Sequence, residues 1–280
     1  MNKAKLSIII VGLNVKEWLI PCLRSIFKNP PSFNFEVIYV DNGSSDETCL
    51  EVRSLFPKVK IIQSKSNLGF TKANNLGFQY SNGEYLLFLN SDTEIVGQAL
   101  SKMVNYLEVH KKIGVLGPKL YQNREHKLQI SSTGELTPLA AIFAFTFLNK
   151  WFPNNQFSKK YFLSDWDRDS ERQVAAVSGA ALMIRKEIFE KIEGFDERFF
   201  IYFEESDLCR SVRKIGCQVV YYPKAEVVHF GGKTTSKISW QMKSVFLLSR
   251  FKYFEKHFGL PVAILTETIL RFFELITKIK

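Results

Sequence analysis

An acidic cluster in the last third of the sequence has the residue types that proton transfer requires. Glu204, Glu205 and Asp207 place three carboxylates within four residues, directly after the aromatic run 199–203. A carboxylate held beside apolar rings has a raised pKa and can act as a general base. Acidic residues are also common in the first turn of a helix, which explains the same residues without catalysis.

A second group of polar residues suits a divalent cation that bridges phosphate oxygens. Asn90 and Asp92 flank Ser91 after an apolar run, and residues two apart in an extended chain point to the same side. Oxygen-bearing side chains are the ligands that hard divalent ions prefer. A turn followed by a helix cap accounts for the same three residues.

His229 and Asp41 each end an apolar run, and each has two interpretations. His229 precedes the basic, hydroxyl-rich loop 231–235. It could bind a metal while Lys233 in that loop neutralises a phosphate, or it could be a structural histidine. Asp41 could accept a hydrogen bond from a nucleobase N–H or a ribose hydroxyl, or it could form an Asx turn with the residues that follow it.

The elements that would position these side chains alternate in type over the first ninety residues. Apolar runs that suit strands buried on both faces occupy residues 6–11, 36–40, 60–63 and 84–89. Helical periodicity lies between them, so the strands are predicted to be parallel, with right-handed crossovers. Ligands of such open α/β sheets bind beyond the carboxyl ends of the strands, where the polar residues of this chain stand.

The rest of the chain contains a long irregular segment between regular elements. Residues 121–172 lose their periodicity and hold aromatic residues among Asn, Lys and Asp, which favours a surface insertion that touches a partner or a substrate. Regular elements are predicted around it: helices at 96–110, 186–191 and 206–215, and strands at 113–116, 174–184 and 218–222.

The C-terminal segment carries much of the positive charge. Residues 233–280 contain nine Lys or Arg and three Glu, which is +6 of the net charge of +10. In a helix over 262–279, one face is apolar: Val262, Leu265, Ile269, Phe272, Ile276 and Ile279. The charges on the other face, with the expected pairs Glu267–Arg271 and Glu274–Lys278, make a membrane span costly. We therefore expect a domain over 1–240 and a basic amphipathic segment over 241–280 that lies on a membrane surface or packs on the protein.

Composition and missing motifs exclude several classes of protein. With 280 residues, 46% hydrophobic and 24% charged, the chain forms a real core. Four cysteines without C-x-x-C spacing favour a reducing cytosol. Motifs of dinucleotide oxidoreductases, P-loop NTPases, α/β-hydrolases and zincins do not occur after the predicted strands. The positive charge also suits nucleic acid, but no nucleic-acid-binding motif accompanies it.

Seven motifs in order over residues 6–258 resemble the family 2 glycosyltransferases of the GT-A fold, particularly the rhamnosyltransferase-like members. They are SIIIVGLN (7–14), VDNGSSD (40–46), NLGFTKAN (67–74), LNSD (89–92), SGAALMIR (178–185), GFDERFFIYFEE (194–205) and His229. The resemblance implies an α/β fold with a mostly parallel central sheet and an inverting transfer of a sugar from a nucleoside diphosphate donor, dTDP-rhamnose or a UDP-sugar.

The resemblance also implies an acceptor and a location. Similar enzymes extend glycans or saccharides linked to polyprenyl diphosphate, at the cytoplasmic face of the cell membrane. Galactofuranosyl and N-acetylhexosaminyl transferases share most of the motifs, so these activities are alternatives. A non-catalytic protein that binds nucleic acid or glycans is the alternative from another class.

Matching positions then assign expected roles to individual residues. Asp92 matches the last acid of the family's D-x-D and would carry Mg²⁺ or Mn²⁺, with His229 as a second ligand. Asn90 replaces the first acid, which weakens its contribution to the metal. Glu205 matches the catalytic base, with Glu204 and Asp207 as orienting groups or alternatives. The residues expected to bind the nucleotide and the donor sugar are Val11, Leu13, Asn14, Asp41, Asn67, Gly69, Phe70, Asn74, Asn90, Ser91 and Lys233.

Overall fold

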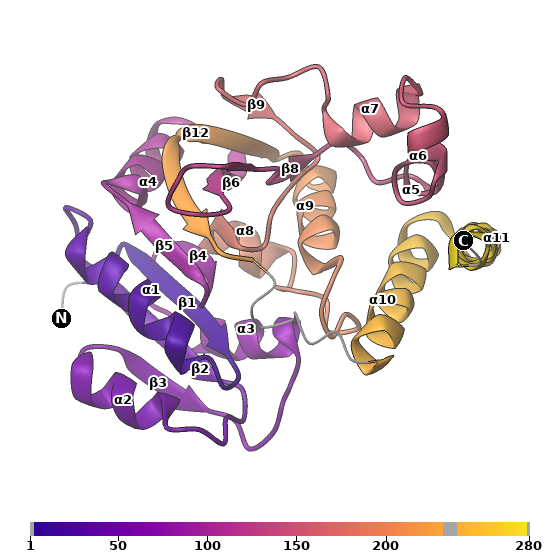
Figure 1. Ribbon diagram of the computed structural model, residues 1–280. Helices are drawn as coiled ribbons and strands as arrows, with labels where there is room; N and C mark the ends of the chain where they lie inside the picture. Colours follow the sequence, from indigo (N-terminus) through magenta and orange to yellow (C-terminus); the bar gives the residue numbers. More distant parts are fainter. Residues whose placement is uncertain (1–2, 232–239, 279–280) are drawn as a thin grey trace.

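A computed structural model of the chain describes residues 3–231 and 240–278 (Figure 1). In chain order its elements are β1 (Leu6–Gly12), α1 (Lys16–Lys28), β2 (Phe35–Asp41), α2 (Thr48–Leu55), β3 (Lys60–Gln63), α3 (Phe70–Gln79), β4 (Tyr85–Asn90), β5 (Thr93–Val96), α4 (Ala99–Val109), β6 (Ile113–Tyr121), β7 (Leu128–Gln129), β8 (Ser132–Thr133), α5 (Pro138–Ala144), α6 (Leu148–Trp151), α7 (Gln156–Phe162), β9 (Arg172–Gln173), β10 (Ala176–Val177), β11 (Ala181–Arg185), α8 (Lys186–Lys191), α9 (Glu204–Lys214), β12 (Gln218–His229), α10 (Trp240–Phe258) and α11 (Leu260–Lys278).

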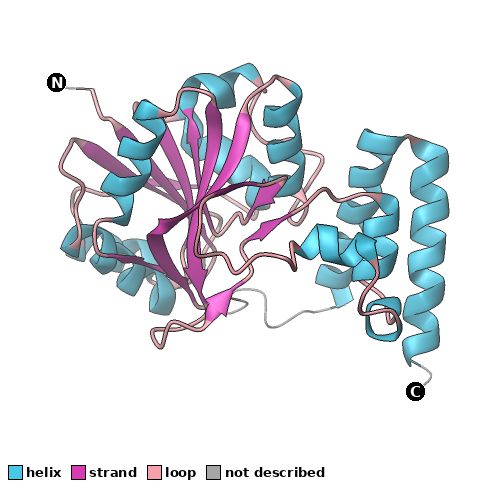
Figure 2. Ribbon diagram, turned by 90° about the horizontal axis from the view of Figure 1, so that it is seen from above, coloured by secondary structure: helices cyan, strands magenta, loops and turns pink. Residues whose placement is uncertain are grey.

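A mixed sheet with helices on both faces forms the centre of the molecule (Figure 2). Its strand order is β3-β2-β1-β4-β11-β6-β12-β5. The first four strands of the chain are parallel, as their alternation with helices predicts. β11 then runs antiparallel to both β4 and β6, which makes the sheet mixed. The carboxyl ends of β1, β2 and β4 meet at one edge, because their registers pair Gly12 with Asp41 and Val11 with Asn90.

Three predicted strands are wrong in their extent, and the first of them, 113–116, continues as β6 to Tyr121. The run 174–184 is interrupted at 178–180, so that β10 pairs with β8 in a small separate sheet while β11 joins the main one. β12 continues beyond Pro223 to His229, and its pairing with β6 shifts register between Tyr222 and Glu226. An irregularity in the ladder is where a strand tolerates a proline, which cannot donate a backbone hydrogen bond.

Helices from the irregular segment and from the C-terminus form a further layer beside the sheet domain. α5, α6 and α7 lie next to α10 and α11 (Figure 1). An apolar cluster joins this layer to the body of the protein, because Tyr253 and Phe254 of α10 and Leu270 of α11 pack with Phe199 and Phe203. The predicted insertion therefore does not stand alone on the surface.

α11 places its charged side against the protein and its apolar side outward. Glu267 is 5% exposed and is bound by Arg250 of α10, itself 1% exposed, at 2.9 Å. Arg250 also pairs with Glu274 at 2.9 Å. The predicted pair Glu267–Arg271 is present at 2.8 Å, whereas the side chain of Lys278 lies outside the described residues.

The apolar face predicted for the C-terminal helix therefore does not pack on the protein. Val262, Leu265, Phe272 and Ile276 are exposed, and Ile269 is half-buried. The side chain of Ile279 is not among those described. In the described part of the chain, no helix combines the length and the apolar character that crossing a membrane requires.

Removing the guanidinium of Arg250 tests this arrangement. In Arg250→Met, Glu267 is left buried without its main partner, and breaking a buried ion pair from one side costs about 3–5 kcal/mol. We expect the free energy of unfolding, measured by urea denaturation, to fall by that amount. Arg271→Met is the control, because Arg271 binds the same carboxylate from an exposed position and should cost less than about 1 kcal/mol. Equal losses in the two variants would contradict the assignment.

Candidate active site

One cleft of about 620 Å³ at the carboxyl ends of the strands brings most of the predicted residues together. Its volume lies in the range of small-molecule sites. The predicted residues that line it are Val11, Leu13, Asn67, Gly69, Phe70, Asn90, Ser91, Asp92, Glu204, Glu205 and His229. Groups from β1, β4, β12 and the start of α9 thus face the same space, although the first and the last of them, Val11 and His229, stand at opposite ends of the sheet domain's sequence.

Four predicted residues do not line this cleft. Asp41 is buried at the end of β2, where its carboxylate accepts from Ser44 N at 3.1 Å, three residues on and not the two of an Asx turn. Asn14 accepts from the backbone N–H groups of residues 45 and 46, and Asn74 donates to the carbonyl of Phe70 within α3. Lys233 lies outside the described residues.

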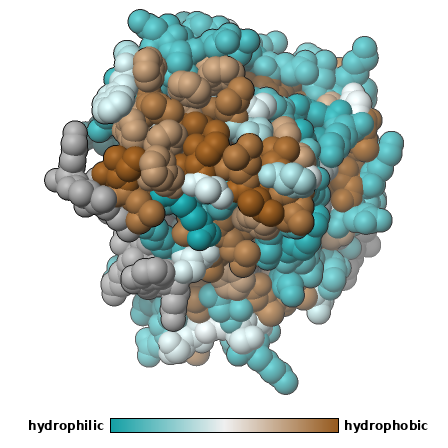
Figure 3. Space-filling view, turned by 90° about the vertical axis from the view of Figure 1, so that its right-hand side faces the viewer, coloured by the Kyte–Doolittle hydropathy of each residue, from teal (hydrophilic) through white to brown (hydrophobic). Residues whose placement is uncertain are grey.

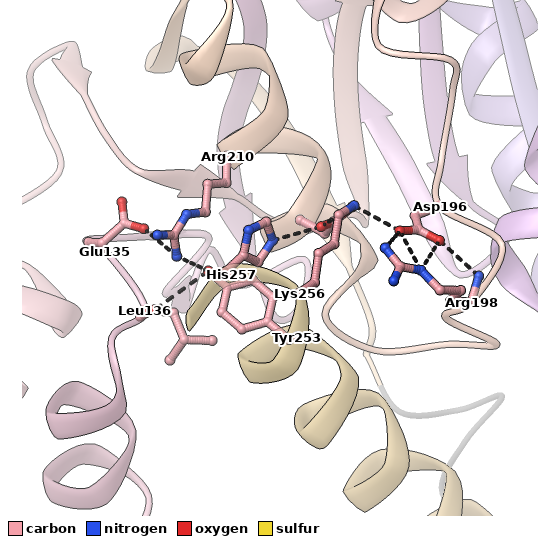
Figure 4. A network of polar contacts seen from close by, with 9 residues as sticks. Glu135, Leu136, Asp196, Arg198, Arg210, Tyr253, Lys256 and His257 are labelled. Carbon is pink, nitrogen blue, oxygen red and sulfur yellow. Dashed lines mark hydrogen bonds and ion pairs between the residues drawn. The ribbon is translucent and has the colours of Figure 1, made fainter. Parts of the chain in front are cut away.

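Asp207 is the fourth described residue that does not line the cleft, and it points away from the cleft toward α10. Its carboxylate is 2.7 Å from Lys256 Nζ and 2.7 Å from His257 Nε2. Lys256 also binds Asp196 at 2.8 Å, so two acids are joined through one lysine (Figure 4). Burial lowers the pKa of His257, which favours the neutral imidazole. Asp207 therefore holds α10 on α9 and does not touch the space where a substrate would lie.

Asp92 and His229 form the acidic and imidazole side of the cleft. Asp92 is buried, and its Oδ1 lies 3.4 Å from His229 Nε2. Asn90 Nδ2 is 3.4 Å from the same nitrogen, and Gln129 Oε1 is 3.1 Å from His229 Nδ1. When Nδ1–H donates to Gln129, Nε2 is left as an acceptor beside the carboxylate oxygen. A hydrogen bond of this kind fixes the tautomer of a metal-binding histidine.

This donor set fits a divalent cation. A carboxylate oxygen and an imidazole nitrogen with its lone pair face each other, and the amide of Asn90 can present its oxygen by a rotation of the amide. Among the described residues, no group of three or more His, Cys, Asp or Glu side chains is close enough together to hold a metal. A cation here would take its remaining ligands from substrate phosphates and water, as Mg²⁺ commonly does. The carboxylate, together with phosphate and water oxygens, also suits Mn²⁺.

The acid pair at the start of α9 lines the same cleft and is buried. Burial, and then the charge of Glu205, raises the pKa of Glu204 well above its ordinary value. Burial also raises the pKa of Glu205. Glu204 Oε2 is buried without a hydrogen-bond partner. Two neighbouring carboxylates of this kind retain a proton to higher pH than an exposed glutamate does.

A strained loop delivers this acid pair to the cleft. Tyr202 and Phe203 both have left-handed backbone, with φ of 72° and 67°, a conformation that costs aromatic residues of order 1–3 kcal/mol each. Hydrogen bonds from α3 on one side and α10 on the other offset the cost of this strain. Phe70 N donates to the carbonyl of Phe200 at 2.6 Å, and Ser249 of α10 donates to the carbonyl of Ile201 at 2.8 Å.

Gly69 permits the close approach of that loop to α3. Its φ is +81°, and a Cβ at this position would lie 2.6 Å from the carbonyl oxygen of Phe200. Any larger residue would push the loop 199–203 away from the N-terminus of α3. The glycine expected to lie beside the nucleotide therefore also sets where the acid pair stands.

Several lining residues were not among the predicted site residues, although residues 178–180 belong to the motif SGAALMIR. The break at 178–180, inside a predicted strand, lines the cleft between β10 and β11. Met242 and Phe246 of α10 also line it, although the segment from 241 onward was expected to be separate. Phe145 and Tyr161 come from the irregular segment, whose aromatic residues did predict contact with a substrate or partner.

Comparison with known proteins identifies the family of this site. The family model described as "Glycosyl transferase family 2" matches residues 7–193. The N-acetylglucosaminyl-diphospho-decaprenol L-rhamnosyltransferase of Mycobacterium tuberculosis is 27% identical over 212 residues, which cover 72% of this chain and 68% of that protein.

Two solved structures share the fold. GalNAc-T7 with UDP, GalNAc and Mn²⁺ has a TM-score of 0.61 and 17% identity over 81% of this chain and 44% of that one. Staphylococcus aureus TarS 1–349 in complex with UDP-GlcNAc has a TM-score of 0.59 and 18% identity over 96% of this chain and 71% of that one. At this identity the likeness concerns the fold alone.

Neutralising Glu204 should stabilise the protein in a pH-dependent way. The raised pKa means that the folded state binds more protons than the unfolded state above the ordinary pKa, so wild-type stability falls as pH rises through that window. We expect Glu204→Gln to match the wild type in acid and to be more stable near neutral pH, by about 1–3 kcal/mol, the usual cost of a buried polar group without a partner.

Urea denaturation at a series of pH values measures this difference. Glu187→Gln is the control, because Glu187 is exposed on α8 and should give a difference that does not change with pH. A Glu204→Gln variant that is less stable than the wild type at neutral pH would contradict the account.

Proposed function

Since the chain belongs to glycosyl transferase family 2 and is a glycosyltransferase with the GT-A fold, we propose that it transfers a sugar, with inversion, from a nucleoside diphosphate to a hydroxyl of a lipid-linked saccharide. One observation carries this proposal. A carboxylate with a raised pKa, Glu205, faces the same 620 Å³ cleft as Asp92 and His229, the pair proposed to hold a cation.

The reaction is a single displacement in which the chain's residues handle one proton. Glu205 takes the proton of the acceptor hydroxyl as its oxygen attacks the anomeric carbon. The bond from that carbon to the diphosphate oxygen breaks, and its electron pair leaves with the nucleoside diphosphate. One base and one displacement invert the anomeric carbon, whereas a retaining route through a covalent intermediate needs a second carboxylate as nucleophile.

Developing charge on the leaving diphosphate requires a counter-charge in the cleft. Asp92 and His229, with Asn90 beside them, would hold Mg²⁺ or Mn²⁺, which supplies that charge. Mn²⁺ accompanies UDP in the GalNAc-T7 structure, which supports the metal. Lys233, which follows β12 in the sequence and lies outside the described residues, is a further candidate for the phosphate.

For the donor we propose dTDP-rhamnose, and for the acceptor a saccharide on polyprenyl diphosphate. The name of the M. tuberculosis relative supports both the sugar and the lipid diphosphate. The glycosyltransferase domain would extend over 1–240, and the protein would act at the cytoplasmic face of the membrane. Galactofuranose and N-acetylhexosamine donors belong in the same assay, because transfer from one of them would reassign the sugar.

Glu205→Gln tests the base. We expect kcat to fall by about 10²–10⁴-fold, the range that general base catalysis contributes, with little change in the affinity for the nucleoside diphosphate. In the wild type, burial raises the pKa of Glu205, so kcat/KM should rise with pH through a value above that of an ordinary glutamate. NMR of the product gives its anomeric configuration.

The matched control for that variant is Glu190→Gln, an exposed residue of α8 that should keep full activity. Full transfer by Glu205→Gln would show that another group is the base. A product with retained configuration would contradict the single displacement.

His229→Gln tests the cation site without relying on turnover. Loss of the imidazole should weaken Mn²⁺ binding by about 10-fold or more, the effect expected when a metal's ligand shell is disturbed. Mn²⁺ electron paramagnetic resonance in the presence of a nucleoside diphosphate measures the binding directly. His126→Gln, at an exposed position, is the control. Unchanged Mn²⁺ affinity in His229→Gln would remove this residue from the site.

A further inference from the structure

The outer face of α11 is apolar and uncovered in the described part of the chain. Its most exposed side chains are Ile264, Leu265, Phe272 and Leu275, which are 52%, 62%, 59% and 62% exposed. Spacing of three, four and seven residues puts them on one side of the helix. Of the polar residues on this side, Thr268 donates its hydroxyl to the carbonyl of Ile264 at 2.8 Å, and Arg271, 57% exposed at the edge of the face, binds Glu267.

The described charged side chains of α11 form ion pairs with Arg250 and with one another. Glu267 and Glu274 both bind Arg250, and Arg271 closes on Glu267 at 2.8 Å. A surface helix of a soluble domain normally turns its apolar stripe to the core and its charges to water. α11 instead buries Glu267 beside Ala263 and Leu270 and leaves most of its apolar side chains exposed, and buried ion pairs hold it in this orientation. Its outer face is therefore built for an apolar environment.

The apolar surface continues beyond α11. Neighbouring α5 and α6 and the residues next to them add exposed apolar side chains: Leu139, Phe145, Trp151 and Phe152. The side of the molecule that carries these helices shows a broad band of apolar residues (Figure 3). Exposed tryptophan and phenylalanine at the edge of an apolar surface are typical of the boundary between water and lipid.

The charge around this surface is positive. Residues 136–163, which include α5, α6 and α7, contain Lys150, Lys159 and Lys160 and no acidic residue. All three lysines are exposed. The carboxylates of α11 are already paired with arginine, so the layer presents cations next to its apolar face. This combination suits a membrane surface with anionic lipids, because burial of the apolar side chains and attraction of the lysines to the lipid headgroups both favour binding.

We propose that this face, made of the outer side of α11 together with Trp151 and Phe152, docks on a bilayer that contains anionic lipids. A second copy of the chain is the other possible occupant, but a symmetric pair would bring the lysines of both copies together. A bilayer instead gives those lysines anionic partners.

The location of the cleft adds a functional reason, which rests on the proposed function. Phe145 lines both the main cleft and a smaller pocket beside α11, where Phe147 and Phe273 also contribute. A saccharide carried on a lipid in the docked bilayer would therefore lie next to the cleft. Deletion of residues 243–280 would disturb the cleft as well as the outer face, because Phe246 of α10 lines the cleft, so point substitutions are needed.

Point substitutions on the outer face test the docking. The variant Leu265→Gln/Phe272→Gln/Leu275→Gln changes only exposed side chains, so its fold should be kept, which circular dichroism checks. We expect wild-type protein to co-sediment with vesicles of phosphatidylcholine and phosphatidylglycerol, more weakly with phosphatidylcholine alone, and less at high salt. The triple variant should bind the anionic vesicles at least about tenfold more weakly.

The matched control is Leu50→Gln/Leu55→Gln/Val109→Gln, which removes three similarly exposed apolar side chains, 68%, 46% and 74% exposed, from α2 and α4. This control should bind vesicles as the wild type does. Equal binding by the outer-face variant, or no vesicle binding by the wild type, would overturn the proposal. So would a wild-type dimer in sedimentation velocity that the outer-face variant dissociates, since the occupant would then be a second copy.

Two measurements separate this proposal from the proposed function. The outer-face variant should keep its transfer activity on a water-soluble acceptor and lose it on a lipid-linked acceptor in vesicles. Glu205→Gln should bind vesicles as well as the wild type. Vesicle binding without any glycosyl transfer would therefore leave the docking in place and remove only the function.

Discussion

The site depends on one constraint: the loop 199–203 is held in a strained conformation between α3 and α10. Left-handed backbone at Tyr202 and Phe203 turns the start of α9 into the cleft. Such strain persists only when surrounding contacts over-determine it. Here, the Phe70 amide and Ser249 bind successive carbonyls of the loop. Without that anchoring, the acid pair would not face Asp92 across the ends of the strands.

This constraint makes the C-terminal helices part of the catalytic unit. α10 anchors the loop, lines the cleft and binds Asp207 of α9 through Lys256 and His257. α11 is in turn fixed to α10 by Arg250. The same buried charges that secure the helix also turn its apolar side outward. One set of ion pairs therefore links the geometry of the acid pair to the surface that we assign to a membrane.

The N-terminal half could be read from the sequence because its signals are local. The strands at 6–11 and 60–63 are short apolar runs between helical patterns, and polar residues stand where each strand ends. The remaining features depend on residues that are distant in the sequence. Which side of α11 faces the protein, left open by the sequence, is decided by Arg250, 17 residues away, which binds the buried Glu267. Asp207 reads as a catalytic acid beside Glu205 until Lys256 and His257 are seen to bind it. The break at 178–180 lies where two sheets separate, and the apolar run 174–184 alone does not predict that position.

A crystal structure with Mn²⁺ and an unreactive nucleoside diphosphate sugar tests the central claim most directly. The account predicts the metal on Asp92 and His229, the diphosphate next to it, and the anomeric carbon turned toward Glu205 with space for an acceptor hydroxyl between them. Reacting atoms should lie about 3–3.5 Å apart once that hydroxyl is bound. A donor bound with its sugar directed away from Glu205, or a metal held by other residues, would contradict it.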